Sequence, residues 1–343
     1  MNTDLQATVI VVGYNGARYL PDCLSSILDQ DLPPDQYNVV FVDNNSTDHS
    51  IELVRRQFPS IKIIASNRNQ GFFAACNMVA PTAQGRYLVV VPQDTIAHRR
   101  WLPELIRTAQ ENDEALICTA NSIGPKAADY ATQPRIGPVS EIHYRELSRL
   151  GHVTFRAAPY TDQAFGTLAC SGVSGLFKPQ ILAKTGCLFE PLMGHYASDM
   201  EAGLRAAVTG YKVLCVPTAV IYHVGDEDKS LADAGLLLRY ALGSRDILLA
   251  YYKNMTPLEF LLALPLLILG RAAKCLELRT SIPKRIVLFL ASLAATPALL
   301  LLTMARLPRF SLARRGMVTR RAVDRLWLLR QLLLQQRGPG GYT

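Results

Sequence analysis

Two short runs of β-branched and aromatic residues, each ending in small polar residues, constrain the fold more than any other feature of this sequence. Residues 9–12 (Val-Ile-Val-Val) lead into Gly13-Tyr14-Asn15, and residues 39–42 (Val-Val-Phe-Val) lead into Asp43-Asn44. Each run precedes a helical pattern, which is typical of a buried parallel strand that delivers a polar loop to the carboxyl edge of a sheet. Ligands of open α/β sheets bind at that edge, so the pair of loops predicts a nucleotide site there. Either loop alone would predict only a turn and a helix cap.

Strand-like and helix-like patterns alternate over the first 120 residues. The strand-like runs occupy residues 7–13, 37–43, 60–65, 86–91 and 114–120, and the helical patterns lie near 17–29, 47–57, 71–83 and 100–112. This alternation predicts a doubly wound, mainly parallel sheet with helices on both faces. The alternation fails between about 121 and 166, which we interpret as a long excursion over the edge of the sheet that holds the ligand.

Regular structure is predicted again from residue 169 onward. An apolar turn at Ala169–Lys178 is followed by a helix at Ser198–Thr209, a strand at Lys212–Val216 and a short strand ending at Tyr222-His223. Long helices of Leu, Ala and Arg begin near residue 231. We therefore expect one α/β domain over residues 1–230, divided near residue 120, and a separate basic helical region over residues 231–343.

Charge is divided unevenly between these two regions. Residues 1–228 carry 18 Lys and Arg against 23 Asp and Glu, whereas residues 229–343 carry 18 against 5, a net charge of +13. A basic, Leu-rich segment indicates a membrane surface or nucleic acid as its partner. Its Arg residues are interleaved with Leu and not with stacking aromatic residues, so we expect no nucleic-acid binding. The seven Cys show no metal-ligand spacing and the N-terminus shows no signal-sequence pattern, which together predict reduced thiols in the cytoplasm.

Three further positions in the α/β part could contact a ligand. Gly71 begins a helical pattern and is followed by small residues, which permits close approach of a phosphate group to a helix N-terminus. Asp94 follows the buried run 89–91 and either caps the next turn or binds Mg²⁺ or Mn²⁺, since a cation on a diphosphate needs only one or two protein carboxylates. His223 ends a strand at the same predicted edge, where a neutral imidazole can be a metal partner.

Asp199 is the candidate general base. It lies at the predicted N-terminus of the helix at Ser198–Thr209, where the helix dipole keeps a carboxylate ionised. Glu201 is the competing carboxylate, but at a spacing of two residues on a helix it lies on a different face.

The ordered series of these motifs resembles the family 2 glycosyltransferases. Val-Val-Gly-Tyr-Asn, Val-Asp-Asn-Asn-Ser-Thr-Asp, Asn-x-Gly-Phe-x-Ala-x-x-Asn, Pro-Gln-Asp-Thr, Ser-Asp-x-Glu and Tyr-His occur in the order and spacing of that family. The similarity covers about residues 7–225 and is greatest to the rhamnosyltransferase-like branch. It implies a GT-A fold, a nucleoside-diphosphate sugar donor, a divalent cation and inversion at the anomeric carbon.

The resemblance also implies roles for individual residues. By their place in the motifs, Asp94 and His223 would bind the cation and Asp199 would act as general base. The other donor-site residues would be Tyr14, Asn15 and Asp43 around the nucleoside, and Asn69, Gly71 and Asn77 along the donor. The residues expected on the acceptor side are Gly172, Ser198, Glu201 and Arg205.

Two departures from the family pattern affect this site. Pro92 and Gln93 stand where many relatives carry Asp, so metal binding would depend on Asp94, His223 and the diphosphate itself. Ser198 replaces the usual Glu before the base, and the acid two residues after the base is Glu201 where relatives carry Asp. The base is retained, whereas the acceptor contacts are altered.

The sequence therefore predicts a metal-dependent inverting glycosyltransferase that adds one sugar to a glycan or lipid-linked acceptor in cell-surface polysaccharide assembly. A sugar nucleotidyltransferase shares the doubly wound sheet, but the loop at residues 13–16 lacks the Gly-rich, Lys- or Arg-bearing character expected of one. A membrane scaffold with a degenerate transferase domain is a second alternative, which Pro92 and Ser198 keep open. The absence of Gln-x-x-Arg-Trp argues against a processive synthase, and the absence of Gly-x-Gly-x-x-Gly after the first strand argues against a dinucleotide-dependent dehydrogenase.

The basic region is expected to lie on the cytoplasmic face of the membrane. Residues 286–305 form an uncharged run of twenty residues between Arg285 and Arg306, which is long enough to span a bilayer. A single span would place the nine Arg of residues 306–343 on the non-cytoplasmic side, against the positive-inside tendency. We therefore favour helices that lie in one leaflet with Arg on anionic headgroups. Packing on the α/β domain, or on a second copy in a homo-oligomer, is the alternative.

Overall fold

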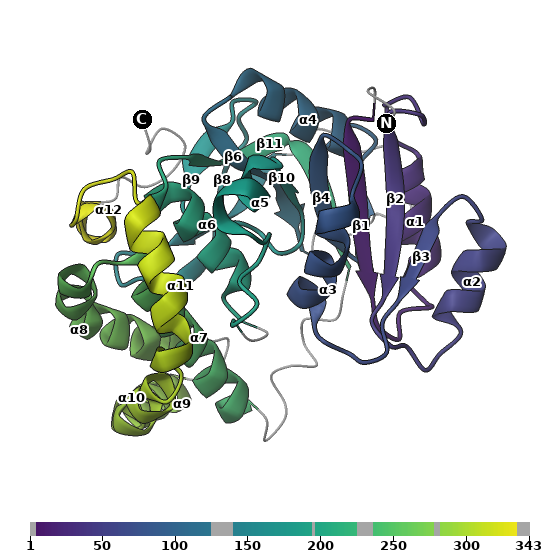
Figure 1. Ribbon diagram of the computed structural model, residues 1–343. Helices are drawn as coiled ribbons and strands as arrows, with labels where there is room; N and C mark the ends of the chain where they lie inside the picture. The colour runs from purple at the N-terminus through teal and green to yellow at the C-terminus, as the bar shows by residue number, and fades with distance from the viewer. Residues whose placement is uncertain (1–4, 125–139, 194–195, 225–235, 278–281, 335–343) are drawn as a thin grey trace.

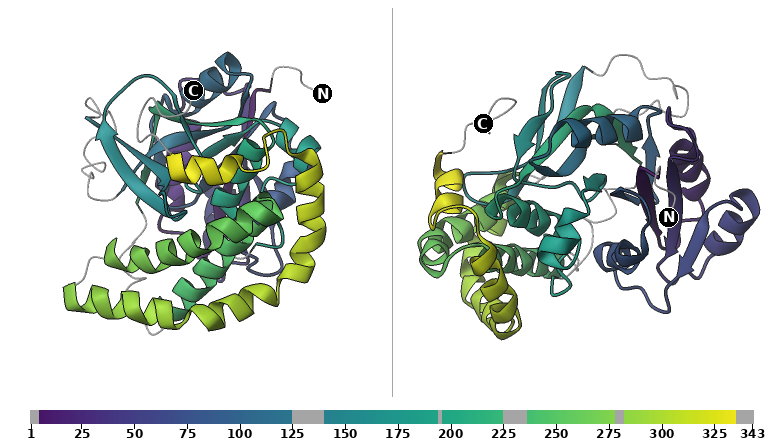
Figure 2. Two further views of the ribbon diagram at one scale, coloured as in Figure 1. Left: turned by 90° about the vertical axis from the view of Figure 1, so that its left-hand side faces the viewer. Right: turned by 45° about the horizontal axis from the view of Figure 1, so that its top comes forward.

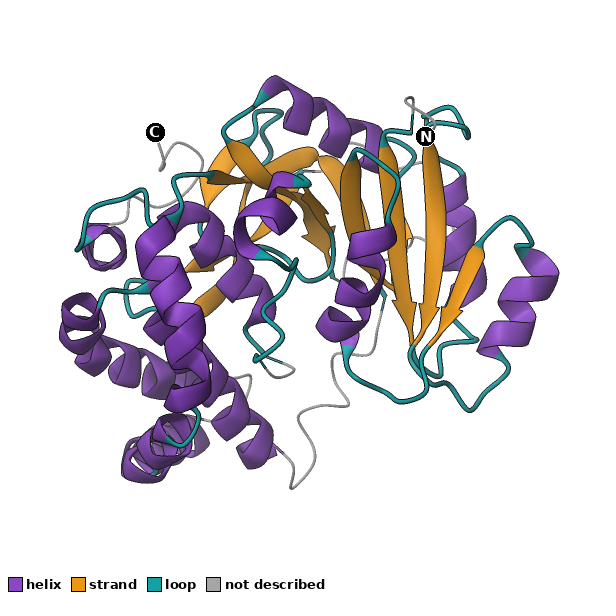
Figure 3. Ribbon diagram, viewed as in Figure 1, coloured by secondary structure: helices purple, strands orange, loops and turns teal. Residues whose placement is uncertain are grey.

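The computed structural model describes residues 5–124, 140–193, 196–224, 236–277 and 282–334. A central sheet has helices on both of its faces, and helices from the C-terminal region pack beside it (Figure 1; Figure 3). This architecture confirms the predicted α/β fold class.

Nine strands form the main sheet within the described residues. The path through the sheet is β3-β2-β1-β4-β10-β6-β11-β5, and β9 also pairs with β11. The bounds are β1 (Ala7–Gly13), β2 (Tyr37–Asp43), β3 (Lys62–Ala65), β4 (Tyr87–Pro92), β5 (Thr95–Ala97), β6 (Ala115–Ile123), β9 (Phe165–Thr167), β10 (Gly175–Phe177) and β11 (Lys212–His223). Strands β3, β2, β1 and β4 run parallel, as predicted. Strands β7 (Glu141–Leu147) and β8 (Val153–Pro159) form a separate antiparallel hairpin.

The helices fall into two groups. Those of the α/β part are α1 (Leu20–Leu28), α2 (Ser50–Gln57), α3 (Phe72–Val79), the short η1 (Ala80–Thr82), α4 (Trp101–Glu111), α5 (Gln180–Thr185) and α6 (Ser198–Val208). The second group, called the tail helices below, comprises α7 (Leu236–Asn254), α8 (Pro257–Lys274), the short η4 (Cys275–Glu277), α9 (Ile282–Ala294), α10 (Thr296–Met304), α11 (Leu307–Arg320) and α12 (Trp327–Leu334).

Strand β1 shows why the central strands read as continuous apolar runs. Successive side chains of a strand point to opposite faces of a sheet. Val9 and Val11 belong to a core formed with α1 and α4, whereas Ile10 and Val12 belong to a second core formed with α3 and α6. Because both faces of β1 are buried, apolar side chains predominate on both of them, and the one polar side chain, Thr8, accepts a hydrogen bond from the Gly85 N–H.

Three short strands depart from the predicted parallel arrangement. β10 is antiparallel to its neighbours β4 and β6, and β5 and β9 are antiparallel to β11. Each has only three residues, too few for a periodic pattern to indicate it in the sequence. The two strands predicted near residue 220 are one strand, β11, with a register shift between Val216 and Val220. The predicted excursion contains the β7–β8 hairpin, and residues 125–139 of it lie outside the described residues.

The tail helices share a hydrophobic core with the α/β part. Leu147 of β7, Leu204 of α6, Leu248 of α7 and Phe310 of α11 are all buried in this core. The predicted boundary near residue 230 therefore marks a change of composition but does not separate two cores. The tail helices complete the α/β part on the side of α6.

Among the described residues, no single helix is long and apolar enough to cross a membrane. Residues 285–294 of α9 and 296–304 of α10 reach that length and composition only together, and they are bent by 49° at the break between them. This pair runs along the lower edge of the molecule in the left view of Figure 2.

Phe310→Ala should lower the free energy of unfolding by about 3–5 kcal/mol, because the ring is fully buried in the core that α6 shares with the tail helices. Leu312→Ala is the matched control: Leu312 lies in the same helix and is 78% exposed, so its truncation should change stability by less than about 0.5 kcal/mol. Urea denaturation followed by circular dichroism measures both variants. A separate transition for the tail, with the α/β part unaffected by Phe310→Ala, would contradict the shared core.

Candidate functional site

The loops after β1, β2 and β4 meet at one edge of the sheet, as predicted. Gly13 and Asp43 are register partners at the ends of β1 and β2, and Val12 pairs with Pro92 at the end of β4. Figure 3 shows the arrowheads of β1, β2 and β3 converging at this edge. The pairing therefore brings the predicted nucleoside-site loops and the loop of Asp94 together.

Asn15 links the loops after β1 and β2. Its backbone N–H donates to Ser46 Oγ (3.0 Å), and its Oδ1 accepts from the Thr47 N–H (2.8 Å). Asn15 has a φ of 48°, a left-handed conformation that Asn adopts more readily than most residues. The neighbouring Tyr14 is 44% exposed. The Tyr14 ring is thus available to a ligand, whereas the side-chain oxygen of Asn15 holds the loop after β2.

Gln93 holds the backbone of Tyr14, a role that the sequence did not indicate. Its Oε1 accepts from the Tyr14 N–H (2.9 Å), and its Nε2 donates to the Tyr14 carbonyl oxygen (3.0 Å). Only Gly leaves room for this side chain at two positions of the loop. An added Cβ atom would lie 2.6 Å from Gln93 Oε1 at Gly13 and 1.8 Å from it at Gly16. This chain thus uses the side-chain amide of Gln93 to fix the loop after β1.

Asp43 carries an unsatisfied oxygen at the end of β2. The residue is 1% exposed, and its Oδ2 accepts from the Ser46 N–H (3.0 Å). Its Oδ1 is buried without a hydrogen-bond partner among the described residues. Because a buried carboxylate oxygen without a donor is unfavourable, an N–H or O–H group of a ligand would stabilise it. This position fits the predicted contact with a nucleoside.

A cavity of about 640 Å³ lies between the start of α3 and the loop before α6. Its lining includes Asn69, Gly71 and Asn77 from the predicted donor site and Ser198 from the predicted acceptor side. Asn69 is fixed there because its Oδ1 accepts from Asn44 Nδ2 (3.0 Å) and from the Gly71 N–H (3.0 Å). Residues expected on the two sides of the reaction therefore border one space.

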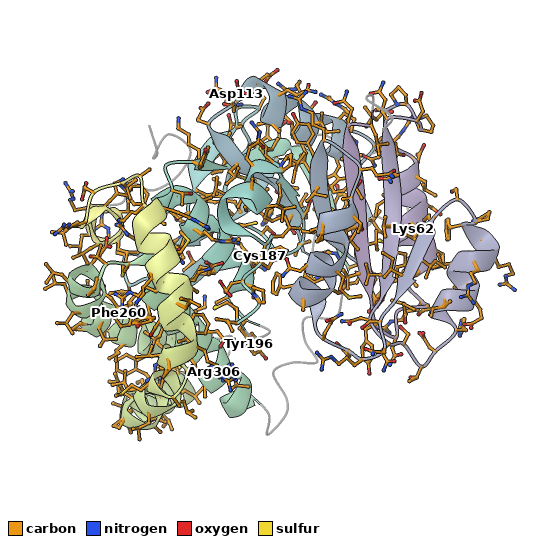
Figure 4. All side chains as sticks on the ribbon, viewed as in Figure 1. Lys62, Asp113, Cys187, Tyr196, Phe260 and Arg306 are labelled. Carbon is orange, nitrogen blue, oxygen red and sulfur yellow. The ribbon has the colours of Figure 1, made fainter. Side chains whose placement is uncertain are left out.

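Asn77 closes one wall of this cavity. Its Nδ2 donates to the Phe189 carbonyl oxygen (2.7 Å), and its Oδ1 accepts from the Phe189 N–H (3.1 Å). Phe189 belongs to the loop between α5 and α6, which Cys187 and Tyr196 mark in Figure 4. Asn77 thus joins α3 to that loop, and both ends of its amide are engaged within the protein. A cavity of similar volume over α4 contains none of the predicted site residues.

Asp94 and His223 lie side by side. His223 Nε2 is 3.3 Å from Asp94 Oδ2, and both side chains are 24% exposed. They meet because β5 pairs with the end of β11 and places His223 opposite Thr95. A carboxylate oxygen and an imidazole nitrogen suit Mn²⁺ or a similar cation. In the described part of the chain no group of three or more His, Cys, Asp or Glu could hold a metal, so such a cation would also need the diphosphate oxygens.

Asp199 lies in the first turn of α6, and protein groups hold both of its carboxylate oxygens. Oδ2 accepts from the Gly172 N–H (3.1 Å) and forms an ion pair with Arg145 Nη1. Oδ1 accepts from the Met200 N–H (2.8 Å). The chain enters α6 through Ala197, whose φ of 59° is a strained left-handed conformation for a residue with a Cβ atom. The predicted base is therefore held in a defined orientation.

Glu201 and Arg205 belong to a buried ion network. Both are 0% exposed; Arg205 Nε lies 3.3 Å from Glu201 Oε2, and Lys253 Nζ of α7 donates to Glu201 Oε1 (2.7 Å). Burial alone would raise the pKa of Glu201, but Arg205 and Lys253 hold that pKa below its ordinary value. Their charges pair within the protein and fix α6, and neither side chain has exposed surface in this structure. The expected contact of these two residues with an acceptor stays a prediction.

The cysteines have no place in this site. The seven Cys are free thiols and all but Cys187 are buried, in agreement with the predicted reduced state. Burial raises the pKa of the Cys23 thiol to about 12, so this thiol is not a nucleophile at neutral pH.

Three residues of the candidate site are not indicated by the sequence alone: Arg145, Gln93 and Asn44. Arg145 comes from β7, inside the excursion for which no regular structure was predicted. Its partner Asp199 is 54 residues away in the chain, and no local pattern indicates a contact at that separation. Gln93 and Asn44 were visible as polar residues at strand ends, but only the fold shows which backbone groups they bind.

Comparison with known proteins agrees with this geometry. The model of the family described as "Glycosyl transferase family 2" matches residues 8–173. The chain carries a family 2 glycosyltransferase domain. The ordered motifs of the resemblance fall largely within that match, whereas Asp199 and His223 lie beyond it.

Two curated relatives show the extent of the sequence similarity. Glycosyltransferase AglE of Haloferax volcanii is 30% identical over 104 residues, which are 29% of this chain and 34% of AglE. TarS of Staphylococcus aureus, a poly(ribitol-phosphate) beta-N-acetylglucosaminyltransferase, is 29% identical over 116 residues, which are 33% of this chain and 20% of TarS. The chain spans about a third of the length of the first curated relatives it matches. These comparisons do not distinguish a rhamnosyltransferase-like branch, which stays a prediction.

Two solved structures extend the likeness of fold beyond the matched domain. TarS 1–349 in complex with UDP-GlcNAc has a TM-score of 0.55 at 18% identity. The match covers 96% of this chain and 90% of the TarS chain. The mannosyltransferase PcManGT of Pyrobaculum calidifontis, in complex with GDP-Man and Mn²⁺, has a TM-score of 0.52 at 21% identity. The match covers 94% of this chain and 87% of the PcManGT chain. The glycosyltransferase domain therefore has the predicted GT-A fold.

Proposed function

We propose that the protein is an inverting glycosyltransferase that moves one sugar from a nucleoside-diphosphate sugar to a hydroxyl group of a glycan or lipid-linked acceptor in cell-surface polysaccharide assembly. The observation that carries this proposal is the placement of Asp199 in the first turn of α6, next to Ser198, which borders the same cavity as Asn69 and Gly71. A base beside the donor space is what displacement by an acceptor hydroxyl requires. The acceptor class is supported by TarS, which is named for transfer to poly(ribitol-phosphate).

The donor would bind along the strand ends and the start of α3. Asp43 Oδ1, which has no partner among the described residues, would accept a hydrogen bond from the nucleoside. The exposed ring of Tyr14 would pack against it, on a backbone that Gln93 holds in place. Gly71, with a φ of 85° at the N-cap of α3, would allow the phosphates to approach the helix N-terminus.

Asp94 and His223 would hold a divalent cation, Mg²⁺ or Mn²⁺, together with the diphosphate. PcManGT, which was solved with GDP-Man and Mn²⁺, supports this assignment. When bound, the cation would stabilise the negative charge that develops on the leaving diphosphate. The two side chains supply one anionic oxygen and one neutral nitrogen, and the donor supplies the remaining ligands.

Asp199 would accept the proton of the acceptor hydroxyl. Its Oδ2 is occupied by Arg145 and Gly172, whereas Oδ1 accepts one hydrogen bond and keeps a second lone pair. The acceptor oxygen forms a bond to the anomeric carbon as the bond from that carbon to the diphosphate breaks. The leaving nucleoside diphosphate keeps the electron pair, and one such displacement inverts the anomeric carbon. Glu201 cannot act as a nucleophile for a second displacement, because it is buried in ion pairs.

Asp94→Ala should weaken donor binding in a metal-dependent way, because it removes the carboxylate that anchors the cation. A thermal-shift screen of UDP-, dTDP- and GDP-sugars with and without Mn²⁺ identifies the donor, since a ligand of the native state raises the melting temperature. Most of the Mn²⁺-dependent increase should be lost in Asp94→Ala and less of it in His223→Ala. An unchanged Mn²⁺ effect would leave Asp94 as a turn cap. A wild-type protein that binds no nucleotide sugar would favour the scaffold alternative.

Asp199→Asn should leave donor binding nearly unchanged and lower turnover by about a hundredfold or more, because Asn has the size of Asp but no basic lone pair. Release of nucleoside diphosphate from the donor found in the screen measures the rate. Near wild-type release by this variant would exclude Asp199 as the base. Release of pyrophosphate from a nucleoside triphosphate and a sugar phosphate would instead identify a nucleotidyltransferase.

We propose further that the tail helices lie on the cytoplasmic membrane surface. Helices α8, α9 and α10 expose apolar side chains in the basic region: Leu258, Leu261, Leu262, Leu269, Ile286, Val287, Leu290, Leu301, Leu302 and Met304. Figure 4 shows Phe260 and Arg306 of this region on the side of the molecule away from Lys62 of β3. Apolar area and the net charge of +13 over residues 229–343 would both favour an anionic leaflet. The 49° bend between α9 and α10 supports a position within one leaflet over a straight crossing.

Simultaneous replacement of Ile286, Val287 and Leu290 by Gln should lower binding to phosphatidylglycerol-containing vesicles by about tenfold or more, because three exposed apolar side chains of α9 are lost without a change of charge. Flotation measures binding. High salt should release only part of the wild-type protein, because screening removes only the electrostatic share. Leu28→Gln in α1 is the control for an exposed apolar residue elsewhere. Unchanged flotation of the triple variant, or a dimer without lipid that the variant abolishes, would contradict the membrane proposal.

A further inference from the structure

The β7–β8 hairpin lies between the predicted base and the tail helices. Arg145 of β7 forms an ion pair with Asp199 Oδ2, and the Arg145 side chain is only 22% exposed. The turn of the hairpin, between Leu147 and Val153, contacts α7 and α8 instead. One short element thus touches both the site and the C-terminal region.

The contact between the hairpin turn and the tail helices is close. Tyr251 Oη of α7 donates to the Gly151 carbonyl oxygen (3.0 Å). A Cβ atom on Gly151, which has a φ of 74°, would lie 2.3 Å from Leu267 Cδ2 of α8. A Cβ atom on Gly270 of α8 would lie 2.0 Å from the Leu150 carbonyl oxygen. Since not even a methyl group fits at Gly270, a shift of α8 toward the hairpin must move the turn.

The helix that carries the base is held by the same part of the structure. Lys253 and Asn254 at the end of α7 both donate to Glu201 Oε1, at 2.7 and 3.3 Å. Glu201 lies two residues after Asp199 in α6. The hairpin that carries Arg145 therefore contacts α7 and α8, and the helix that carries Asp199 contacts α7 through Glu201.

We propose that Arg145 is a positioning residue for Asp199, and that α7 and α8 set the geometry of this pair. The inference rests on the proposed role of Asp199 as base. Arg145 and the Gly172 N–H both hold Oδ2, which fixes the rotation of the carboxylate group. Misplacement of a reacting group by about 1 Å costs on the order of a hundredfold in rate, so a small shift of the hairpin lowers turnover while the nucleotide site is unchanged.

Arg145→Ala tests the positioning role directly. With the nucleotide sugar found in the thermal-shift screen and water as the acceptor, release of nucleoside diphosphate should fall by about tenfold or more at unchanged donor affinity. Arg149→Ala is the matched control, because it removes the same charge from an exposed position in the same hairpin. Millimolar guanidinium should restore part of the rate of Arg145→Ala, which the loss of a merely structural contact would not allow. A rate at or above that of the wild type would overturn the positioning role.

Gly270→Ala tests the connection to the tail helices. Ala is ordinarily favoured over Gly within a helix by about 0.5–1 kcal/mol, but at residue 270 its methyl group would push against Leu150. Gly316→Ala in α11 is the matched control, since an added Cβ there has nothing within 4 Å. Gly270→Ala should release nucleoside diphosphate about fivefold or more slowly with donor affinity retained, and Gly316→Ala should match the wild type.

Tyr251→Phe covers the case in which Gly270→Ala does not fold, as judged by its melting transition. It removes only the hydroxyl group that donates to Gly151, and like Gly270→Ala it should slow the release of nucleoside diphosphate. Wild-type rates in every folded variant would overturn the connection.

If the wild type binds no nucleotide sugar, the proposed function fails. If Asp199→Asn is inactive while Arg145→Ala is fully active, only the positioning role fails.

Discussion

The buried charge of Glu201 governs how the parts of this molecule fit together. It lies in α6 two residues after Asp199, and an unpaired carboxylate at such a site costs several kcal/mol. Its partners come from two directions, Arg205 one turn along α6 and Lys253 from α7, which also pairs with Glu190 of the loop before α6. The helix can therefore lie only where α7 and this loop meet it. The position of Asp199, the proposed base, follows from that ion network.

The edge of the sheet proposed to bind the nucleotide is held together by a different kind of interaction. Neutral side chains at the strand ends bind backbone or side-chain groups of neighbouring loops: Asn15 with Thr47, Asn44 with Asn69, and Gln93 with Tyr14. Each such hydrogen bond contributes only about 0.5–1.5 kcal/mol net, but together they join the loops after β1, β2, β3 and β4. The Asp43 oxygen is left unsatisfied within an otherwise connected network, and it is there that we propose the nucleoside contact.

The sequence predicted the parts of the site that depend on local pattern. The buried strands ending at Gly13, Asp43 and Pro92 are visible as apolar runs, and their parallel pairing brings the polar loops to one edge. The ion pair of Asp199 with Arg145 depends on a hairpin whose position is set by contacts far along the chain. The burial of Glu201 under α7 was not predicted for a related reason: spacing on a helix shows which way a side chain points but not which helix will cover it.

The hydrogen bonds between Asn77 and Phe189 have a consequence for how the chain acquires its structure. They connect residues 112 positions apart, and closing a loop of that length carries an entropic cost that must be met before the contact forms. Chains emerge from the ribosome N-terminus first, so β1–β4 are available long before Phe189, and Lys253 follows later still. The parallel half of the sheet can assemble early, whereas the cavity and the helix of Asp199 wait for the second half of the chain. During synthesis the edge of the sheet that we propose binds the nucleotide can therefore form before Asp199, the proposed base, is in place.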